Sequence, residues 1–464
     1  MKLNSIILAA GKGTRMRSLD ENKSKCSFEL FHKPLILYVL DAVNDLKPDR
    51  NVVVVGKGAE ALAKIVYGKA LTAEQKRQLG TADAVKAGME KLNNEPGVTV
   101  ILNGDSPLIR GETLKKAYEF HLANENKITL ITATLNEPNS YGRIKRNEDH
   151  SVAAIIETKD LKEDEKNLNE INSGIYFIDN EVLYKEIDLI QPKNAQHEYY
   201  LTDIVSLAIK DHYKVGAFSI EDAKEIGGVN DRLDLLKAFE YLKIRINTQH
   251  ILNGVSIADI NNTYIGPDVT ISNDVEIYPN TWILGQSVIL PNNVIGPNSY
   301  LENVILGESN TILMSHIADT KIGYHNEIGP FTRMRGGCVI GDHCRVGNYV
   351  ELKNVTLHNG VKAAHLTYLG DAEIDDETNI GCGVITANYD GANKFHTHIG
   401  KKAFIGSNAT LIAPIDVKDE AFVAAGSTIT SNVEERDLAI ARARQVNKKG
   451  YAKVLVERAK SKKE

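Results

Sequence analysis

Residues 365–371 read HLTYLGD and place a histidine, a tyrosine and an aspartate in one short segment of a repetitive region. Histidine has the ordinary pKa of a general base near neutral pH, so a positioned histidine could take a proton from a substrate. A lone histidine on a repetitive wall is more often a surface residue without a role, and the chain has 13 histidines. His365 differs because polar segments accompany it, and this favours an active site over a plain scaffold. These segments are RMR (333–335), VELK (350–353) and the insertion NYDGANKFHTH (388–398).

A glycine-rich segment, LAAGKGTRM (8–16), directly follows the first apolar run of the chain. A turn of this kind after a strand presents backbone N–H groups to phosphates, and glycine lets the backbone approach them closely. The segment matches neither the Walker A loop nor the GxGxxG dinucleotide fingerprint. Taken alone it is as compatible with a structural turn as with a phosphate site. Arg15 and Lys25 favour the phosphate site, because both cations lie near the place where a triphosphate would sit.

A carboxylate ends a second apolar run in NGDSPLI (103–109). Open α/β sheets bind ligands at the carboxyl ends of their strands, which is where Asp105 falls. A turn or helix cap is the alternative role for this side chain. Together with a phosphate-binding turn in the same sheet, Asp105 predicts a ligand for Mg²⁺.

The composition is that of a globular protein and excludes several classes of function. The chain has 464 residues, 42% of them hydrophobic, and a net charge of −6, which gives no reason to expect nucleic acid as a partner. The four cysteines (26, 338, 344 and 382) show no zinc spacing, so we expect reduced thiols and a cytoplasmic location. No signal peptide or membrane span is expected. The last twenty residues are basic and predict a frayed tail, with an anion-binding role as the alternative.

The apolar pattern changes at about residue 228. Before it, apolar runs alternate with helix-compatible segments, which predicts an α/β domain with a mainly parallel sheet over residues 1–228. Residues 229–251 have helical spacing and predict a linker helix. The expected strands are SIILAA (5–10), NVVVVG (51–56), VTVILNGD (98–105), KITLITATL (127–135) and SGIYFID (173–179).

From Ile265 onward an aliphatic residue recurs at every sixth position. This period fits neither a helix face nor a coiled coil, and it predicts a β-helix solenoid of hexapeptide repeats over residues 252–464. Cys338 and Cys344 occupy the small inward position of the repeat and should be buried. The series is 265, 271, 277, 283, 289, 295 and 301, then 322, 328, 334, 340, 346 and 352, then 399, 405, 411, 417, 423 and 429.

Taken together, the motifs closely resemble those of the bacterial bifunctional uridylyltransferase/acetyltransferase family. LAAGKGTRM, QLGTADAV, NGDSPLI, YGRI, IIETKD, INSGIY and GVNDRL occur in the order seen in sugar-1-phosphate nucleotidylyltransferases. AAHLTYLGDAEI and NYDGANK, set on a hexapeptide solenoid, are the diagnostic segments. The resemblance covers all but the basic tail. It implies a Rossmann-like nucleotidylyltransferase domain followed by a left-handed parallel β-helix.

The resemblance implies two reactions that make UDP-N-acetylglucosamine, a precursor of peptidoglycan and lipopolysaccharide. Acetyl-CoA first acetylates glucosamine 1-phosphate, and the N-acetylglucosamine 1-phosphate formed then attacks UTP and releases pyrophosphate. Magnesium neutralises charge in the second step. Such solenoids form homotrimers with the acetyl-transfer site between subunits.

The same resemblance assigns residues to the uridylyl-transfer site. Arg15 and Lys25 would act on the phosphates as catalytic cations, and Asp105 with Asn230 would bind Mg²⁺. The residues implied to bind UDP-N-acetylglucosamine are Leu8, Ala9, Ala10, Gly11, Lys25, Gln75, Gly80, Thr81, Asn103, Gly104, Asp105, Gly142, Glu157, Asn172 and Asn230.

For acetyl transfer the resemblance implies that His365 is the base and that Glu351 orients it. The residues implied to bind glucosamine 1-phosphate are Arg335, Lys353, Tyr368, Asn379 and Lys394. Asn388 and Tyr389 are assigned to this sugar phosphate and to acetyl-CoA, and Cys382, Ser407, Ala425 and Arg442 to acetyl-CoA. Cys382 replaces the family's usual alanine, and the register predicts that it faces outward.

Departures from the family pattern and two alternatives complete the sequence picture. Ser24 replaces a usual proline, LFHKPL replaces a commoner GKP, and GTADAV replaces GTGHAV; these three concern loop geometry and sugar selectivity. In the second site, RMRGG lacks a usual proline. A single-function nucleotidylyltransferase with a purely structural solenoid would have no use for HLTYLGD and NYDGANK. A non-catalytic binding module would leave the phosphate and Mg²⁺ residues unexplained.

Overall fold

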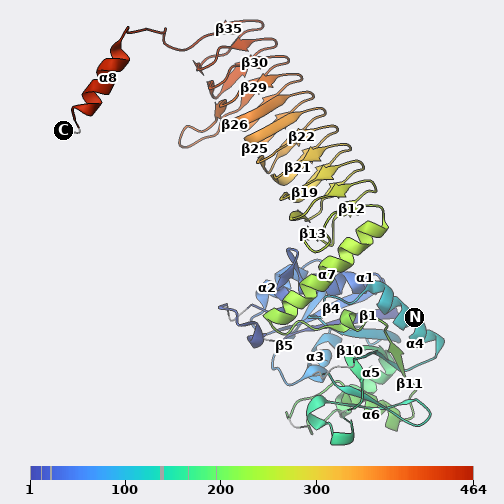
Figure 1. The fold of residues 1–464 in the computed structure, drawn as a ribbon. Helices are drawn as coiled ribbons and strands as arrows, with labels where there is room; N and C mark the ends of the chain where they lie inside the picture. The colour runs from blue at the N-terminus through green and yellow to red at the C-terminus, as the bar shows by residue number, and fades with distance from the viewer. Residues whose placement is uncertain are drawn as a thin grey trace. The chain divides into compact units, whose positions relative to one another are not determined.

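The computed structural model describes residues 2–11, 13–20, 23–135, 141–165, 167–194 and 196–462. Two compact units divide the chain, Met1–Leu242 and Lys243–Glu464. The first is built on a twisted sheet and the second on a stack of short strands (Figure 1). Among the described residues, no helix combines the length and the apolar character that crossing a membrane requires.

The first unit is an α/β structure whose central sheet is covered on both faces. Its strand order is β11-β7-β10-β6-β1-β4-β5, and β10 alone runs antiparallel to its neighbours along that path. A hairpin, β8 with β9, pairs with β10 outside the path. The strands are β1 (Lys2–Ala9), β4 (Arg50–Gly56), β5 (Leu71–Gln75), β6 (Gly97–Asn103), β7 (Ile128–Thr134), β8 (Arg143–Arg146), β9 (Val152–Ile156), β10 (Glu170–Asp179) and β11 (Val215–Ser219).

Alternate side chains of the central strands enter two separate cores. Ile7 and Val53 pack with α1, α2 and α4 on one face, whereas Ile6 and Val54 pack with α3, α5 and α6 on the other. Burial on both faces explains why these strands are continuous apolar runs. The helices are α1 (Leu35–Asn44), α2 (Glu60–Val66), α3 (Thr81–Met89), α4 (Gly111–Ala123), α5 (Asn180–Glu186) and α6 (Asp203–Lys210).

A long helix, α7 (Arg232–Leu252), contains the boundary between the two units. Within the first unit its Phe239 ring stacks on Phe31 at 4.5 Å between ring centres. Within the second unit its Asn247 side chain donates hydrogen bonds to the carbonyls of Ile260 (3.0 Å) and Thr263 (2.8 Å). The two ends of the helix thus belong to different cores.

The second unit is a parallel β-helix, as the period of six predicts. Its strands run from β12 (Ser256–Ile257) to β35 (Leu438–Ala439) in one 24-stranded sheet. Ile265 pairs with Ile283, and Ile283 with Leu301, so one coil advances by three hexapeptides. All residues of the predicted aliphatic series are buried. The inward stack is therefore confirmed.

The coil that contains NYDGANK is longer than the others. Ile374 pairs with Ile399, an advance of 25 residues, whereas the next coil returns to an advance of 18 with Ile399 opposite Val417. The extra residues leave the stack between β28 (Ile385–Ala387) and β29 (Thr397–Ile399). HLTYLGD, by contrast, lies within the regular strand β26 (Lys362–Ile374), where Thr367 and Leu369 point inward.

Polar groups also hold successive coils together. Asn310 is fully buried, donates to the carbonyls of Gly307 and Gly323 (both 2.9 Å), and accepts from the backbone N–H of Asn326 (2.8 Å). Such a ladder satisfies turn carbonyls that would otherwise be buried without partners.

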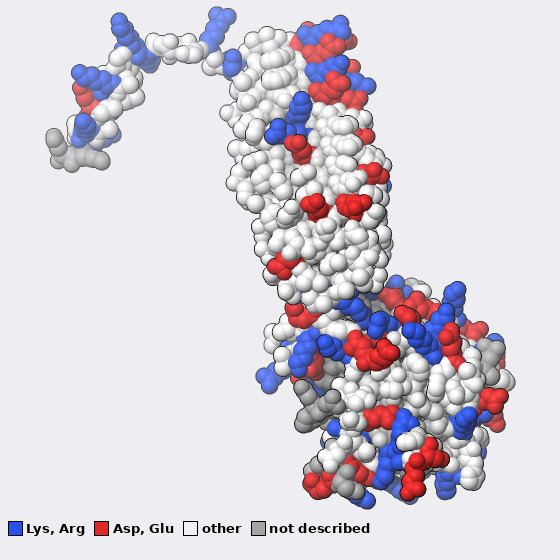
Figure 2. All heavy atoms as spheres, turned by 45° about the vertical axis from the view of Figure 1, so that its right-hand side comes forward, with Lys and Arg blue, Asp and Glu red and all other residues white. Residues whose placement is uncertain are grey.

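At the last coils the outer surface carries mixed charges, including the pair Arg436–Glu420, and red and blue gather there in Figure 2.

Outside the solenoid core, the basic tail forms one helix, α8 (Tyr451–Lys460), whose residues are all exposed. The four cysteines divide as the register predicts. Cys338 and Cys344 are buried, each 2% exposed, and Cys382 is exposed. Cys26 is also buried.

Candidate functional site

The glycine-rich turn after β1 lines a cavity at the carboxyl end of the sheet. Parallel strands bring their carboxyl ends to one edge, so Leu8 from β1, Gln75 from β5 and Asn103 from β6 meet there. The lining includes ten of the residues implied for UDP-N-acetylglucosamine: Leu8, Ala9, Ala10, Gly11, Lys25, Gln75, Gly80, Thr81, Asn103 and Asp105. The structure therefore gathers most of that set in one place.

Gly80 shows why one of these positions needs glycine. Its φ is +125°, and a Cβ there would lie 2.4 Å from the backbone oxygen of Tyr199. That oxygen accepts a hydrogen bond from the N–H of Ala82 (2.9 Å), and the N–H of Tyr199 donates to Leu79 (2.8 Å). The loop before α3 is thus pinned against the segment around Tyr199.

The side chain of Gln75 is held in one orientation. Its amide nitrogen donates to a carboxylate oxygen of Asp83 (2.8 Å) and to the carbonyl of Gly80 (3.0 Å). Both partners are acceptors, so the amide nitrogen must face them. The Gln75 carbonyl oxygen is then the atom that can accept an N–H from a base in the cavity. Asp83, which stands where the family usually has histidine, was not assigned a role from sequence.

Positive and negative groups converge beside the cavity. The Lys25 ammonium contacts a carboxylate oxygen of Asp105 and lies 3.1 Å from the amide oxygen of Asn230. Arg15, on the short 3₁₀ turn Thr14–Met16, donates to the same Asn230 oxygen at 2.9 Å. Ser24 caps the turn that carries Lys25, since its hydroxyl accepts from the N–H of Cys26 (3.3 Å). The serine thus starts the turn where the family usually has proline.

Asp105 and Asn230 together satisfy the chemistry of a magnesium site. Their oxygens already converge on one cation, the Lys25 ammonium, although the two residues are far apart in the sequence. Carboxylate and amide oxygens are ligands suited to Mg²⁺. The donor set therefore fits the metal that the resemblance implies.

An adjoining cavity holds three of the five residues that the resemblance implies for the ribose and the N-acetyl sugar, which are Asn103, Gly104, Gly142, Glu157 and Asn172. It shares Leu8, Thr81 and Asn103 with the first cavity and adds Glu157 and Asn172. Burial raises the pKa of Glu157, which the hydrogen bond from the Thr202 hydroxyl (3.2 Å) partly offsets.

Further contacts tie the remaining predicted residues to these cavities. The N–H of Asn172 donates to the carbonyl of Gly142 (2.9 Å), and the N–H of Gly104 to that of Leu8 (2.9 Å). Several polar residues of the linings were not assigned from the sequence, among them Gln78 and Tyr176, which lie in quoted motifs, and Thr202.

In the solenoid, His365 belongs to one column of residues at a single corner. Val346 pairs with Ala363, Ala363 with Ile380, Ile380 with Ile405, and Ile405 with Val423. In successive coils, the residue two positions after each of Ala363, Ile380, Ile405 and Val423 lies at the same corner. These residues are His365, Cys382, Ser407 and Ala425. Backbone hydrogen bonds confirm the register: Gly383 to Leu366 (2.8 Å), Asn408 to Cys382 (2.7 Å) and Gly426 to Ser407 (2.8 Å).

This corner column brings the predicted base next to residues implied for acetyl-CoA. All four side chains are exposed, and neighbouring coils of a parallel sheet are about 4.8 Å apart. The Arg442 guanidinium donates to the carbonyl of Ala425 at 2.6 Å and extends the column by one cation. A thioester bound along this corner would lie beside His365.

A cationic cluster forms on the same coils. Lys353 lies beside Lys394 of the insertion and Arg335 of β23 (Arg333–Arg335), and the neighbouring Lys394 ammonium lowers the pKa of Lys353. Like charges kept this close favour an anion that binds between them. Arg335 also donates to Glu351 at 2.9 Å, whereas within the described part of the chain no hydrogen bond or ion pair joins Glu351 to His365.

The remaining sugar-phosphate residues are placed by the neighbouring coil and the insertion. A Cβ at Gly370 would lie 2.5 Å from the Tyr368 hydroxyl and 2.8 Å from the Asn388 amide nitrogen, so the ends of these two side chains meet over Gly370 and would have to move if it carried a side chain. The Asn388 amide donates to Asp371, which sequence reasoning did not assign. Tyr389, 61% exposed, donates to the carbonyl of Gly391 (2.6 Å). Asn379 begins β27 (Asn379–Ile380), half-buried.

Comparison with known proteins agrees with this division of sites. A nucleotidyl transferase model matches residues 4–241, a GMPPB C-terminal domain model matches 246–363, and a model for the hexapeptide repeat of succinyl-transferase matches 397–431. Fold and site thus define a nucleotidyl transferase joined to a hexapeptide-repeat transferase.

Curated relatives match nearly the whole chain. The chain is 45% identical to the bifunctional protein GlmU of Staphylococcus haemolyticus over 98% of its own length and all of the relative's. The proteins of the same name from Staphylococcus epidermidis and an Exiguobacterium species are 44% and 43% identical with the same coverage. The chain belongs to the family of bifunctional GlmU proteins. It is a bifunctional enzyme of UDP-N-acetylglucosamine synthesis, and the fold and function predicted from the sequence are confirmed.

Proposed function

We propose that the corner column and the cationic cluster perform acetyl transfer to glucosamine 1-phosphate. His365 removes a proton from the ammonium of the sugar, the amine attacks the thioester carbonyl of acetyl-CoA, and the coenzyme A thiolate leaves. The position of His365 beside the column of Ser407 and Ala425 supports this assignment. It is the single observation that carries the acetyl-transfer proposal.

The cationic cluster gives the sugar phosphate its binding site. Arg335, Lys353 and Lys394 supply guanidinium and ammonium donors, which bind phosphate oxygens through charge-assisted hydrogen bonds. An anion here relieves the repulsion that lowers the pKa of Lys353. Asn388 and Tyr368 lie close enough together at Gly370 to contact the sugar hydroxyls.

The cavity in the first unit performs uridylyl transfer. A phosphate oxygen of N-acetylglucosamine 1-phosphate attacks the α-phosphorus of UTP, and pyrophosphate leaves. Asp105 and Asn230 would hold Mg²⁺, which neutralises charge on the phosphates when bound. Lys25 and Arg15 supply fixed cations on the same side, and Gln75 accepts the imide N–H of uracil. No protein nucleophile is required.

The N-acetyl sugar is recognised in the adjoining cavity. Glu157 and Asn172 line it and are the groups assigned to that substrate. Acetylation therefore precedes uridylyl transfer, and glucosamine 1-phosphate should be a poor acceptor of the uridylyl group. Equal turnover of the acetylated and unacetylated sugar phosphates with UTP would contradict this order.

We also propose a cytoplasmic homotrimer with the acetyl-transfer site between subunits. Exposed apolar residues next to the corner column support a second copy on this face: Leu366 is 60% exposed, and Phe331 stacks on Tyr349 at 5.1 Å. Sedimentation of the parent and of Leu366→Glu tests the assembly. A fully active monomer would refute it.

The two sites are tested by separating the two reactions. His365→Ala should abolish acetyl transfer and leave uridylyl transfer near the parent rate, and Asp105→Ala should do the reverse. His343→Ala, which removes an exposed histidine elsewhere on the solenoid, is the control for the first variant. If either active-site change silenced both reactions in a folded protein, the assignment of two sites would be wrong.

A further inference from the structure

A second group of titratable side chains lies on another corner of the solenoid. His358 follows the inward residue Leu357, Asp375 follows Ile374, and Glu373 precedes it. Because Leu357 pairs with Ile374, the strand register brings all three side chains to one patch on two adjacent coils. This corner differs from the one that carries His365, and the proposed reaction uses none of the three.

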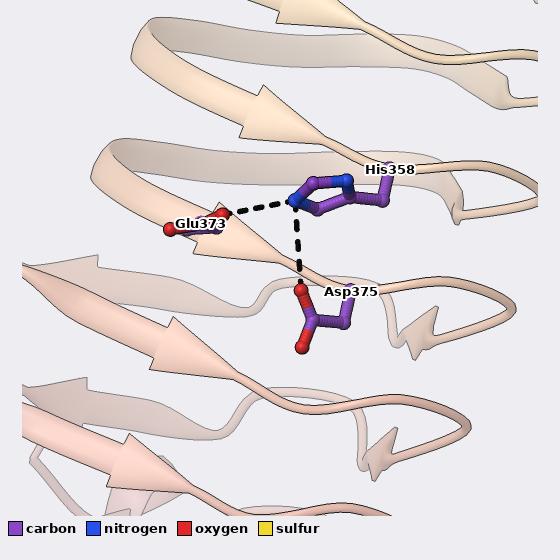
Figure 3. A group of neighbouring side chains, drawn as sticks. All are labelled: His358, Glu373 and Asp375. Atoms are coloured by element: carbon purple, nitrogen blue, oxygen red, sulfur yellow. Dashed lines mark hydrogen bonds and ion pairs between the residues drawn. The ribbon is translucent and has the colours of Figure 1, made fainter.

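The three side chains point toward one another (Figure 3). The Nε2 atom of His358 lies 2.9 Å from a Glu373 carboxylate oxygen and 3.6 Å from an Asp375 oxygen. Their side chains are 41%, 45% and 21% exposed, so a hydrated ion can reach them. One ligand atom from each residue lies within 4.8 Å of the other two.

These separations match those around a small divalent cation. With metal–ligand bonds of about 2.0–2.2 Å and tetrahedral angles, two ligand atoms are about 3.3–3.5 Å apart. The observed values of 2.9 and 3.6 Å bracket that range, so small side-chain rotations suffice. One imidazole and two carboxylates leave a further position for water, and the imidazole favours Zn²⁺, Co²⁺ or Ni²⁺ over Mg²⁺ and Ca²⁺.

A third coil supplies the outer support that metal ligands usually have. Nε2 of His398 lies 3.2 Å from the second oxygen of Asp375, and its Nδ1 lies 2.9 Å from Asp416. Both ring nitrogens are thus occupied by carboxylates, so His398 orients Asp375 and is not itself a ligand. Lys418 in turn pairs with Asp416. Hydrogen bonds of this kind fix the ligand that contacts the metal.

We propose that His358, Glu373 and Asp375 bind one divalent transition-metal ion, with His398 as the positioning residue of Asp375. The ion links two successive coils of the solenoid from outside. It takes the place of the hydrogen bonds that His358 makes to the two carboxylates. Its expected effect is on the stability of these coils, because the site lies on a different corner from the proposed acetyl-transfer residues.

Cobalt binding to the full-length protein tests the proposal. Co²⁺ with an imidazole ligand in a site of low coordination number absorbs visible light strongly, whereas an all-oxygen octahedral site absorbs weakly. The background Asp105→Ala removes the carboxylate of the other expected metal site. In that background, Co²⁺ should give the strong bands at one ion per chain, and Zn²⁺ should displace it and raise the melting temperature.

Matched variants assign the signal to these residues. His358→Ala should remove the strong bands and the thermal shift, and His398→Gln should weaken binding by about 10-fold to 100-fold. His343→Ala removes an exposed histidine that lies one coil earlier on the same corner and stacks on His325; because it is not one of the proposed ligands, it should change neither. Circular dichroism checks that each variant is folded. Strong bands that persist in His358→Ala, or the absence of both bands and thermal shift in the parent, would overturn the proposal.

Discussion

Chemical modification of Cys382 should block acetyl transfer selectively. This cysteine is exposed and lies one coil from His365 on one side and one coil from Ser407 on the other. Neighbouring coils are about 4.8 Å apart, so a succinimide attached to the thiol would extend over the space that the thioester must occupy. The uridylyl-transfer site lies in the other unit and carries only Cys26, which is buried.

The size of the effect follows from this geometry. Because the adduct prevents a near-attack arrangement at His365, stoichiometric N-ethylmaleimide should lower the acetyl-transfer rate at least about hundredfold. Methyl methanethiosulfonate, which adds only a methylthio group, should cause a smaller loss. Acetyl-CoA should protect the thiol from both reagents. Uridylyl transfer, measured in the same samples, should not change.

Two controls make the experiment decisive. Mass spectrometry of the labelled protein should find the adduct on Cys382 and not on the buried Cys338 or Cys344. Cys382→Ala should keep acetyl transfer, because alanine usually stands there in the family, and should resist the reagent. Full activity in completely labelled parent protein, or equal inhibition of Cys382→Ala, would refute the placement of acetyl-CoA on this corner.

Three further outcomes are expected. Lys394→Gln should weaken the inhibition of acetyl transfer by N-acetylglucosamine 1-phosphate about tenfold. Because the lowered pKa of Lys353 then rises, the affinity for this sugar phosphate should persist to higher pH than in the parent. An unshifted pH profile would contradict the contact between Lys353 and Lys394. Asp83→Ala should reduce the preference for UTP over CTP in uridylyl transfer about tenfold, because one of the two acceptors that orient the Gln75 amide is lost. Unchanged selectivity would exclude a role of Asp83 in orienting Gln75. Asn310→Ala should lower the free energy of unfolding by about 3–4 kcal/mol in urea titrations, because it leaves buried groups of two coils unpaired. A loss below about 1 kcal/mol would show that the hydrogen bonds of Asn310 are dispensable.

The sequence predicts the main architecture because its periods are strong. Strands buried on both faces, such as β4 and β6, are continuous apolar runs, and the solenoid repeats every six residues. Two edge strands, β5 and β11, escape prediction because edge positions demand less burial. In LTAEQ of β5, only Ala73 and Gln75 are buried. The antiparallel direction of β10 also leaves no mark in its apolar run.

Site residues can be predicted where they belong to a sequence motif. They cannot be predicted where only the pairing of distant strands brings them together. Lys25 lies on a short 3₁₀ turn and Asn230 just before α7, and only the fold brings the two side chains within 3.1 Å; the resemblance alone had assigned both to the uridylyl-transfer site. Asp83 and Asp371 were missed, because a polar residue in a helix or strand has no signature until its partner is known. The group of His358 and Asp375 is likewise invisible in sequence, since only the coil advance makes these residues neighbours.

The long coil at residues 374–399 has a consequence for how the solenoid can change over time. Its extra residues leave the stack, and the next coil returns to the regular advance. Each coil is therefore in contact only with the coils before and after it, and its length at a corner is independent of theirs. Insertions and deletions at a corner are local events, so new loops can be acquired without relocating residues already in the column. The solenoid can thus evolve by changes in the length of one coil at a time.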